Sequence, residues 1–467
     1  MKIIFVMRYT HHFHYFKSIV RALYERGHDA TVFFTRNTRN PRNEDIFLEG
    51  VESSRGDIPK LEYDFIKNTE GSWNELASLI HVILSYRRYL RVNNQSDYYR
   101  DRMTIYIPWY LKPFITWRVF WPLVRSDFFG RVLKFLESRI PYAPSVLEEI
   151  KKFNPEAIIV APPNMSGTSV DSEYIRVAKH LKIPVAVPVI SWDYLGTKGF
   201  IATQPDLLLV WNETQVKDAI EHHEIAIENI KIIGAPVFDN WFSHLKSSVS
   251  KEEFCRRHGL NSDFPIVTYL GSSRNMAKDE SWILDLMIKS LAGHVDPRIR
   301  NTQIIVRPHP HNYKIYQRLK QEFKPVFILP ESGTLPNTES NLQFFYDTLS
   351  VSEVAIQGVN TSGVIDAMIA GVPTVTFLTD EYKTTQVDTT HFQQLLENKT
   401  TPFLKDPEEF APVLLDLLNG KDEYKEKRQE FIRKFIRPRG LEISAGEWGV
   451  REVEKLVELP ITNNQLR

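Results

Sequence analysis

The sequence of 467 residues contains a single cysteine and has no long apolar run. One thiol forms no internal disulfide, so Cys255 excludes a disulfide framework and favours a reducing compartment. No stretch of about 18 apolar residues suggests a membrane span, and the apolar run in MKIIFVM is too short for a signal peptide. We therefore expect a cytoplasmic protein.

An excess of charge of either sign is also missing. The 58 Lys and Arg residues balance the 58 Asp and Glu residues, so we expect no nucleic-acid partner. No G-x-G and no G-x-x-x-x-G-K-[ST] occurs, which excludes the dinucleotide fingerprint and the Walker-type ATP site. The length predicts two or three domains.

The most informative stretch lies between residues 351 and 392. An apolar run, Val351 to Ile356, is followed by a small polar turn, Gly358 to Gly363, and by an apolar helical pattern that ends at Gly371. A second apolar run, Thr374 to Leu378, follows at once. This order predicts one strand–turn–helix–strand unit.

The turn of this unit carries the first candidate ligand-binding residues. Asn360, Thr361 and Ser362 open the predicted helix, where N–H groups and the helix dipole favour a phosphate. Asp366 follows one turn later, where a carboxylate suits ribose hydroxyls. An ordinary helix cap with a solvated aspartate has the same pattern, so both interpretations stay open at this point.

The motif N-T-S-x-x-x-D-A-x-x-x-G-V-P, followed by Gln386, resembles the donor-binding signature of GT-B fold glycosyltransferases. The resemblance implies that Thr361 and Ser362 bind the donor diphosphate, that Asp366 binds the ribose and that Gln386 contacts the sugar. The family more often has Glu at the ribose position, so Asp366 is a departure.

A second motif, R-P-H-P at residues 307 to 310, follows the apolar run Ile304 to Val306. Arg307 offers a fixed fork of donors for phosphate oxygens, and His309 a further donor. The motif resembles those of bacterial capsule-type glycosyltransferases and of teichoic acid glycerophosphate transferases. A turn set by two prolines is the structural alternative.

Gly271 and Ser272 follow the apolar run Pro265 to Leu270, and a small turn of this kind lets backbone N–H groups approach a phosphate. Any tight strand-to-helix turn has the same composition.

Two halves of alternating strands and helices predict an α/β protein with two Rossmann-like, doubly wound domains. The expected boundaries are 1–240 for an acceptor domain, 241–262 for a linker, 263–425 for a donor domain and 426–467 for C-terminal helices. The resemblance implies that the domains face a cleft and that a C-terminal helix, at Gly446 to Leu459, crosses back onto the first domain.

The first half offers two candidates for a general base. His11, His12 and His14 follow the first predicted strand, and the resemblance points this loop into the cleft. A histidine of ordinary pKa removes a hydroxyl proton at neutral pH, and we select His12 by position. Asp193, in S-W-D-x-L-x-x-K-G, is a rival base or an orienter of His12. A solvated turn and a helix cap are the structural alternatives.

No D-x-D pair occurs, so the metal site of the other large glycosyltransferase fold is missing. We therefore expect no metal and no cofactor, with a nucleotide-sugar as substrate and with Arg, His and helix starts neutralising its diphosphate.

Residues 86 to 126 form a basic and aromatic insertion. They contain eight Lys or Arg, two Asp and eleven aromatic residues. Aromatic and basic side chains favour an anionic lipid surface, which predicts peripheral membrane association and a lipid-linked acceptor. Aromatic side chains packed inside the first domain are the alternative.

The sequence thus predicts a metal-independent glycosyltransferase of cell-envelope polysaccharide biosynthesis, which moves a sugar to a cell-surface glycan or lipid-linked acceptor. A CDP-glycerol-type glycerophosphotransferase and a non-catalytic nucleotide-binding protein are the alternatives. A sugar-nucleotide epimerase is disfavoured, because its acidic and His-rich catalytic strings are not evident.

Overall fold

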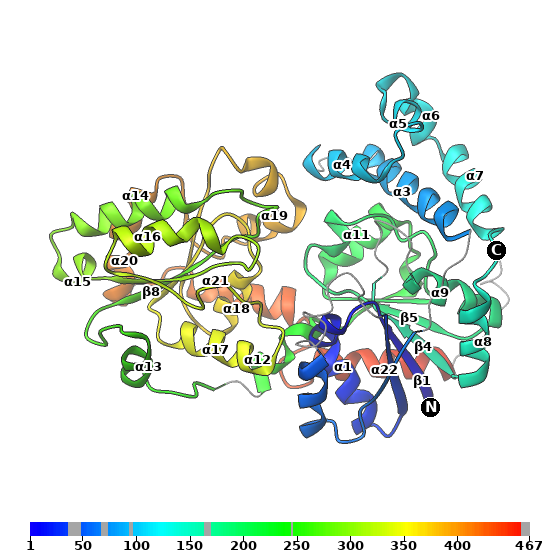
Figure 1. The fold of residues 1–467 in the computed structure, drawn as a ribbon, viewed down its shortest axis with the longest axis horizontal. Coiled ribbons are helices and arrows are strands. Elements are labelled where there is room, and N and C mark those ends of the chain that lie inside the picture. The colour runs from blue at the N-terminus through cyan, green and yellow to red at the C-terminus, as the bar shows by residue number, and fades with distance from the viewer. Residues whose placement is uncertain (36–47, 67–72, 93–96, 163–169, 244–245, 459–467) are drawn as a thin grey trace. The chain divides into compact units, whose positions relative to one another are not determined.

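The computed structural model describes residues 1–35, 48–66, 73–92, 97–162, 170–243 and 246–458. The chain divides into two compact units (Figure 1). The first unit comprises Met1–Asp239 and Phe435–Arg467, and the second comprises Asn240–Lys434.

The first unit is built on a seven-stranded parallel sheet in the order β3-β2-β1-β4-β5-β6-β7. The strand order reverses between β1 and β4, which defines a topological switch point. The central strand Ala157–Val160 is apolar throughout and buried, as expected for a sheet covered on both faces. The strands are β1 (Lys2–Met7), β2 (Asp29–Phe34), β3 (Glu62–Phe65), β4 (Ala157–Val160), β5 (Val185–Pro188), β6 (Leu207–Val210) and β7 (Ile230–Ile232).

The C-terminal helix returns to the first unit, as the sequence predicts. Helix α22 (Ala445–Glu458) packs along α1 (Phe13–Glu25) (Figure 1). The buried carboxylate of Asp239 accepts the backbone N–H groups of Ala445 (3.0 Å) and Gly446 (2.9 Å). It also pairs with Arg437 at 3.0 Å, so one buried aspartate holds the returning chain.

The second unit contains a six-stranded parallel sheet in the order β10-β9-β8-β11-β12-β13. Its switch point lies between β8 and β11. The strands are β8 (Ile266–Leu270), β9 (Gln303–Arg307), β10 (Val326–Ile328), β11 (Val354–Gln357), β12 (Thr374–Phe377) and β13 (Phe403–Leu404). The main surrounding helices are α14 (Ser281–Ala292), α16 (Gln317–Glu322), α17 (Glu339–Ser350), α18 (Gly363–Ile369), α19 (Thr390–Glu397) and α20 (Phe410–Leu418).

The segment 241–262, expected to be a linker, contains helix α13 (Lys251–His258). Phe254 and Cys255 of this helix are buried in one cluster with Ile266 and Ile305. The described part of this segment therefore adds to the apolar core of the second unit.

A helical insertion interrupts the first unit and carries its own apolar core. It consists of α3 (Trp73–Arg91), α4 (Asp97–Met103), α5 (Lys112–Thr116), α6 (Trp121–Arg125) and α7 (Asp127–Ser138). Tyr86, Tyr89 and Tyr99 are buried in this core, so part of the aromatic content serves packing. Helices α5 and α6 lie at the end of the insertion, beyond α3 and α7 (Figure 1).

Two of the eight basic residues counted in the insertion are buried. Arg88 is buried, and its guanidinium donates to the carbonyls of Gly196 and Lys198, in and just after the short helix α10 (Tyr194–Thr197). Arg87 is buried against Gly130 of α7. These two side chains hold the insertion together and join it to the rest of the unit, so they are not available to a lipid surface.

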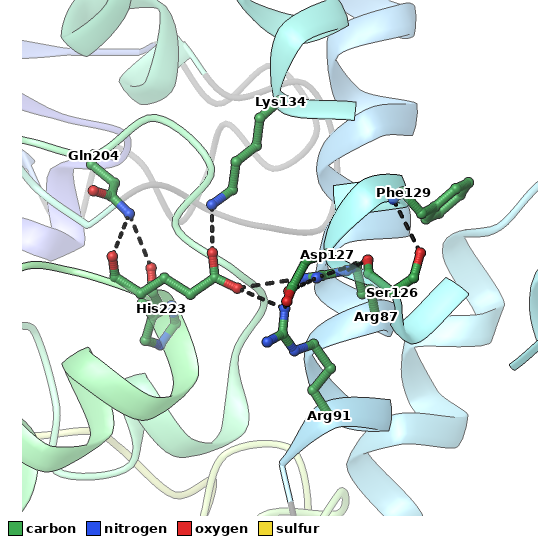
Figure 2. A network of polar contacts seen from close by, with 9 residues as sticks. Arg87, Arg91, Ser126, Asp127, Phe129, Lys134, Gln204 and His223 are labelled. Atoms are coloured by element: carbon green, nitrogen blue, oxygen red, sulfur yellow. Dashed lines mark hydrogen bonds and ion pairs between the residues drawn. The ribbon is translucent and has the colours of Figure 1, made fainter. Parts of the chain in front are cut away.

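A network of ions completes this junction (Figure 2). Glu224 lies at the C-terminal end of α11 (Glu213–His223). Its carboxylate accepts hydrogen bonds from Lys134 at 2.5 Å and from Arg91 at 3.2 Å. The carboxylate of Asp127 accepts hydrogen bonds from Arg91 at 2.5 Å and from Arg87 at 3.2 Å. Helices α3 and α7 of the insertion are thus tied to α11 of the α/β body.

None of the described helices is long and apolar enough to cross a bilayer.

Two glycines of α22 test its packing on α1. A Cβ on Gly446 would lie 2.4 Å from the backbone carbonyl of Ser18, a contact that no rotamer change relieves. We expect Gly446→Ala to lower the free energy of unfolding by about 1–3 kcal/mol, the usual cost of overpacking. Urea denaturation measures this difference.

Gly449→Ala is the matched control in the same helix. Its nearest neighbour, Ile233 Cδ1, would lie at 3.4 Å, so alanine fits. Alanine in a helix interior is worth up to about 1 kcal/mol over glycine, and we expect stability to be kept or raised. Equal effects of the two substitutions would contradict the close packing of Gly446 on α1.

Candidate functional site

Polar loops gather at the carboxyl edge of the sheet in the second unit. Gly271 and Ser272 follow β8, and Gly358 to Ser362 follow β11. These two strands flank the switch point, where ligands bind in doubly wound sheets. Arg307 ends the neighbouring strand β9. The two sequence motifs therefore lie at the same edge of the sheet, after strands that are separated only by β8.

One buried carboxylate joins these loops. Glu280 accepts the backbone N–H of Ser272 after β8 and that of Val359 after β11, the latter at 3.0 Å. The Tyr316 hydroxyl donates to the same carboxylate at 2.6 Å. Burial raises the pKa of Glu280, and these donors oppose the shift. Sequence analysis missed Glu280, which lies in the polar run Lys278–Glu280 just before a helix.

The βα turn predicted to bind phosphate is packed against the protein itself. Ser272 is buried, and its hydroxyl accepts the backbone N–H groups of Val359 (3.2 Å) and Asn360 (3.0 Å). A Cβ on Gly271 would lie 2.6 Å from the Tyr316 hydroxyl, so the small residue admits Tyr316. These contacts position the loops, and direct contact of Gly271 and Ser272 with a donor stays a prediction.

The amides of Asn360 and Gln386 join the loops that follow β11 and β12. Asn360 donates to the Thr385 carbonyl at 2.8 Å. Gln386 is buried and donates to the carbonyls of Val359 (2.5 Å) and Phe377 (2.7 Å). Both donors of the Gln386 amide are therefore used within the chain, and its contact with a sugar stays a prediction.

Thr361 and Ser362 lie nearer to solvent than the other predicted donor residues. The Thr361 hydroxyl accepts the N–H of Gly363 at 3.3 Å, and Ser362 is exposed at the start of α18. The Ser362 side chain makes no cap hydrogen bond to the helix. Both hydroxyls stay accessible at the strand edge.

Arg307 is a buried cation whose hydrogen bonding is incomplete. Its residue is 5% exposed, and its Nη1 atom is buried without a hydrogen-bond partner. Nη2 donates to Thr334 at 3.4 Å, and the guanidinium lies 4.2 Å from the centre of the Phe345 ring. Burial lowers the pKa of Arg307 to about 10. A buried donor without a partner is costly, and an anion bound there would remove that cost.

Asp366 is the buried counterpart of Arg307. It lies in α18, and burial raises its pKa to about 8, whereas the charge of Arg307 opposes this shift. A guanidinium and a carboxyl group that interact at the end of parallel strands are the groups that a phosphate and a ribose require.

His309 is neutral in this structure. Burial and the nearby His311 lower its pKa to about 4. Its Nδ1 accepts the backbone N–H of His311 at 3.1 Å, which leaves the proton on Nε2. His309 therefore serves as a neutral hydrogen-bond donor, and the cationic role that the sequence offered is not supported.

His12 ends a short turn (Thr10–His12) after β1, beside the switch point of the first sheet. Its Nδ1 atom is buried without a hydrogen-bond partner. Burial, with the charges of His11 and Arg8, lowers its pKa well below 6.5. The expectation of an ordinary pKa is corrected: His12 is a neutral imidazole over a wider pH range, with Nδ1 able to accept a proton.

Asp193 is bound into its own turn. Its carboxylate accepts the hydroxyls of Ser191 (2.6 Å) and Thr197 (2.9 Å) and lies 3.5 Å from the Lys198 ammonium. These contacts stabilise the start of α10 (Tyr194–Thr197). A role of Asp193 as base, or as orienter of His12, stays a prediction.

Comparison with known proteins identifies the fold. No family model matches the chain, and no curated protein matches it in sequence. Among solved structures, it is similar to the UDP-GlcNAc 2-epimerase of Methanocaldococcus jannaschii, with 15% identity, a TM-score of 0.56 and coverage of 97% of this chain and 100% of that one.

Two further structures agree. One is the UDP-GlcNAc 2-epimerase of Neisseria meningitidis bound to UDP-GlcNAc, with 12% identity, a TM-score of 0.56 and coverage of 98% of this chain and 100% of that one. The other is a glycosyltransferase of Rickettsia africae, with 11% identity, a TM-score of 0.54 and coverage of 98% and 99%. The chain therefore has two Rossmann-like domains of the GT-B type. Identities this low establish the fold alone.

Within the described ranges, no group of three or more His, Cys, Asp or Glu residues is arranged to hold a metal ion. Metal-independent donor binding stays a prediction.

Glu280→Gln tests the carboxylate that joins the two loops. An amide has one acceptor oxygen, so its NH₂ group would face a backbone N–H of Ser272 or Val359. We expect a loss of about 1–3 kcal/mol in the free energy of unfolding, measured with urea, because a buried donor loses its partner. The exposed Glu381→Gln is the control and should change little. If Glu280→Gln is as stable as the wild type, the shared carboxylate does not hold the two loops together.

Asp366→Asn tests the raised pKa. The pKa of Asp366 is about 8 in the folded state and 3.8 in the unfolded state. The folded state therefore holds the proton more tightly, and this stabilisation is complete below pH 3.8 and is lost as the pH rises through about 8. The stability of Asp366→Asn relative to the wild type should therefore rise across this window, by roughly 1 kcal/mol or more. Urea midpoints at several pH values measure it, with the exposed Asp380→Asn as control. A relative stability that falls with pH would indicate an ionised Asp366 paired with Arg307.

Proposed function

We propose that this protein is a metal-independent glycosyltransferase that moves a sugar from a nucleotide-diphosphate donor to a cell-surface glycan or lipid-linked acceptor. The observation that carries the proposal is the unbonded, buried Nη1 of Arg307 at a strand end beside the switch point. A cation held in this way is ready for an anionic ligand and has no structural partner of its own on that nitrogen.

The neighbouring groups fit the parts of a nucleotide-sugar. Arg307 and the neutral Nε2–H of His309 would donate to diphosphate oxygens. The hydroxyls of Thr361 and Ser362, on the loop after β11, would donate to the same group. Asp366 would bond the ribose hydroxyls, because a carboxyl group accepts whether or not it is protonated. The buried position of Arg307 strengthens its attraction for phosphate, since little water screens it.

Transfer breaks the bond between the anomeric carbon and the diphosphate oxygen and forms a bond from that carbon to an acceptor hydroxyl oxygen. The diphosphate leaves with the bonding electrons, and Arg307 stabilises the charge that develops on it. His12 takes the acceptor proton on its unbonded Nδ1.

Support for the other functions considered from the sequence is weaker. Epimerisation is the reaction named for two of the structures of similar fold, and a fold alone does not decide chemistry. No contact described above favours transfer of a glycerophosphate.

Nucleotide binding tests the donor site. A panel of nucleoside diphosphates and nucleotide-sugars in a thermal-shift assay would identify the donor base, because a ligand stabilises the fold according to its occupancy. Arg307→Ala should weaken the best ligand by about 1.5–3 kcal/mol, the value of a charge-assisted hydrogen bond. Binding should survive EDTA, since cationic and neutral donors of the chain take the place of a metal.

The exposed Arg318→Ala, in α16, is the matched control and should bind as the wild type does. Normal binding by Arg307→Ala, or binding that EDTA abolishes and Mg²⁺ or Mn²⁺ restores, would refute the proposed donor site. Turnover of the bound nucleotide-sugar that depends on an added acceptor indicates transfer. Inversion at a sugar carbon without an acceptor indicates an epimerase.

His12→Ala tests the base. We expect turnover to fall by about 10²–10⁴-fold, the usual contribution of a positioned base. Donor affinity should change little, because the proposed donor residues lie in the other unit. The acid limb of the wild-type rate profile should lie below pH 6.5, since the pKa of His12 is lowered, and should vanish in the variant.

His11→Ala, His14→Ala and Asp193→Asn are the comparison variants. If one of them is inactive while His12→Ala keeps its turnover, the role belongs to that residue. If all keep turnover, the base lies elsewhere or the reaction needs none.

A further inference from the structure

The helical insertion exposes an unusual amount of apolar surface. Of the twenty large apolar side chains that are strongly exposed in the described ranges, twelve lie between Ile105 and Leu136. Trp109 is 84% exposed, Trp117 60% and Phe114 59%. A folded monomer rarely leaves so many large apolar groups together in water unless they bind something.

These side chains are not an unfilled core. Ile107, Ile115 and Val124, from the same short segments, are buried in the apolar core of the insertion. The end of the insertion, defined here as residues 102–126, therefore has one face packed inward and one apolar face turned outward. Figure 1 shows its helices α5 and α6 beyond α3 and α7. We call this end the aromatic tip.

The charge of the aromatic tip has one sign. It contains four basic residues and no Asp or Glu. The basic residues are Arg102, Lys112, Arg118 and Arg125. The last three are exposed, in contrast to the buried Arg87 and Arg88. An anionic partner is therefore matched to the tip in charge as well as in polarity.

We propose that the aromatic tip docks the protein on the surface of a bilayer that contains anionic lipids. Trp and Tyr prefer the headgroup layer, where a ring is partly in hydrocarbon and partly in water, and Lys and Arg are attracted to anionic headgroups. The tip presents Trp109, Tyr110 and Trp117 together with this basic set. A second copy of this chain would bring the same positive charges together, which disfavours a dimer through this face.

The base of the insertion suits a docking role. Arg88 donates to the carbonyls of Gly196 and Lys198. The carboxylate of Glu224 pairs with Lys134 and Arg91 (Figure 2). The aromatic tip is thus fixed to the α/β body of the first unit, so a docked tip would hold that unit at the membrane. This proposal does not depend on the reaction that the protein catalyses.

Co-sedimentation of the full chain with vesicles tests the docking. Vesicles of phosphatidylcholine with phosphatidylglycerol should bind the protein, pure phosphatidylcholine should bind it much less, and added salt should weaken the binding. The triple variant Lys112→Gln, Arg118→Gln, Arg125→Gln should partition about 100-fold more weakly into the anionic vesicles, because each cation contributes roughly a fivefold factor.

The control triple variant is Lys151→Gln, Lys152→Gln, Lys182→Gln, which removes the same charge from exposed positions of the first unit outside the insertion. It should bind as the wild type does. Equal losses in the two triple variants would show non-specific attraction and would overturn the proposal.

Apolar contact is tested separately. Trp109→Ala with Trp117→Ala should lower binding by at least tenfold at every salt concentration, since apolar burial is not screened. Ile227→Ala with Leu441→Ala, at exposed apolar sites of the same unit, is the control and should have no effect. Unchanged binding of the double tryptophan variant would overturn the proposal.

The oligomeric state in the absence of lipid completes the test. Light scattering should give the same oligomeric state for the wild type and for the double tryptophan variant. A stable dimer that this variant dissociates, without any vesicle binding by the wild type, would assign the aromatic tip to contacts between copies and would refute the membrane role.

Discussion

The buried carboxylate of Glu280 is the interaction on which the geometry of the candidate site depends. Strands β8 and β11 are neighbours in the sheet, but backbone pairing ends where the strands end. Beyond that point, Glu280 accepts N–H groups from both following loops, and the Ser272 hydroxyl adds a second connection. Since two loops share one acceptor, neither can move without leaving a buried N–H group without a partner, which is costly in a medium of low polarity. The strand edge is therefore held rigid, as a binding site for a charged ligand requires.

Arg307, at the same strand edge, has fewer hydrogen bonds than a buried guanidinium requires. Buried charges in proteins are normally paired and hydrogen-bonded, and a guanidinium has five donors to place. Here the Phe345 ring covers one face of the guanidinium, Thr334 takes one nitrogen and Nη1 has no partner. The rise in the pKa of Asp366 has the same origin, since its burial is compensated only in part by the charge of Arg307. Perturbed pKa values of this kind, in two buried and interacting groups at a strand edge, are typical of a ligand site.

The sequence predicts the fold well because its signals are local. The apolar runs that become β8, β9, β11 and β12, with glycine and proline at their ends, specify parallel α/β units, and the short motifs lie at strand ends where the topology brings them together. The roles of single polar residues depend on tertiary contacts, and these are not visible in a pattern. Glu280 has no motif, and the buried bonds of Gln386 come from loops that are distant in sequence. The lowered pKa of His12 arises from burial, which the spacing of three histidines does not reveal.

Three arginines show why composition alone does not assign function. Arg88 is buried and bonded to backbone carbonyls, so it is structural, although the sequence places it in a basic and aromatic insertion. Arg118 lies in the same insertion, is exposed beside the Trp121 ring, and keeps its charge available to a surface. Arg307 is buried like Arg88 but donates to no backbone carbonyl: Nη2 donates to the Thr334 hydroxyl, and Nη1 has no hydrogen-bond partner. Arg88 differs from Arg118 in its burial. It differs from Arg307 in its acceptors, which are two backbone carbonyls for Arg88 and one side-chain hydroxyl for Arg307. A cation contributes to stability where acceptors surround it, to docking where water surrounds it, and to ligand binding where it is enclosed and one of its donors is still unpaired.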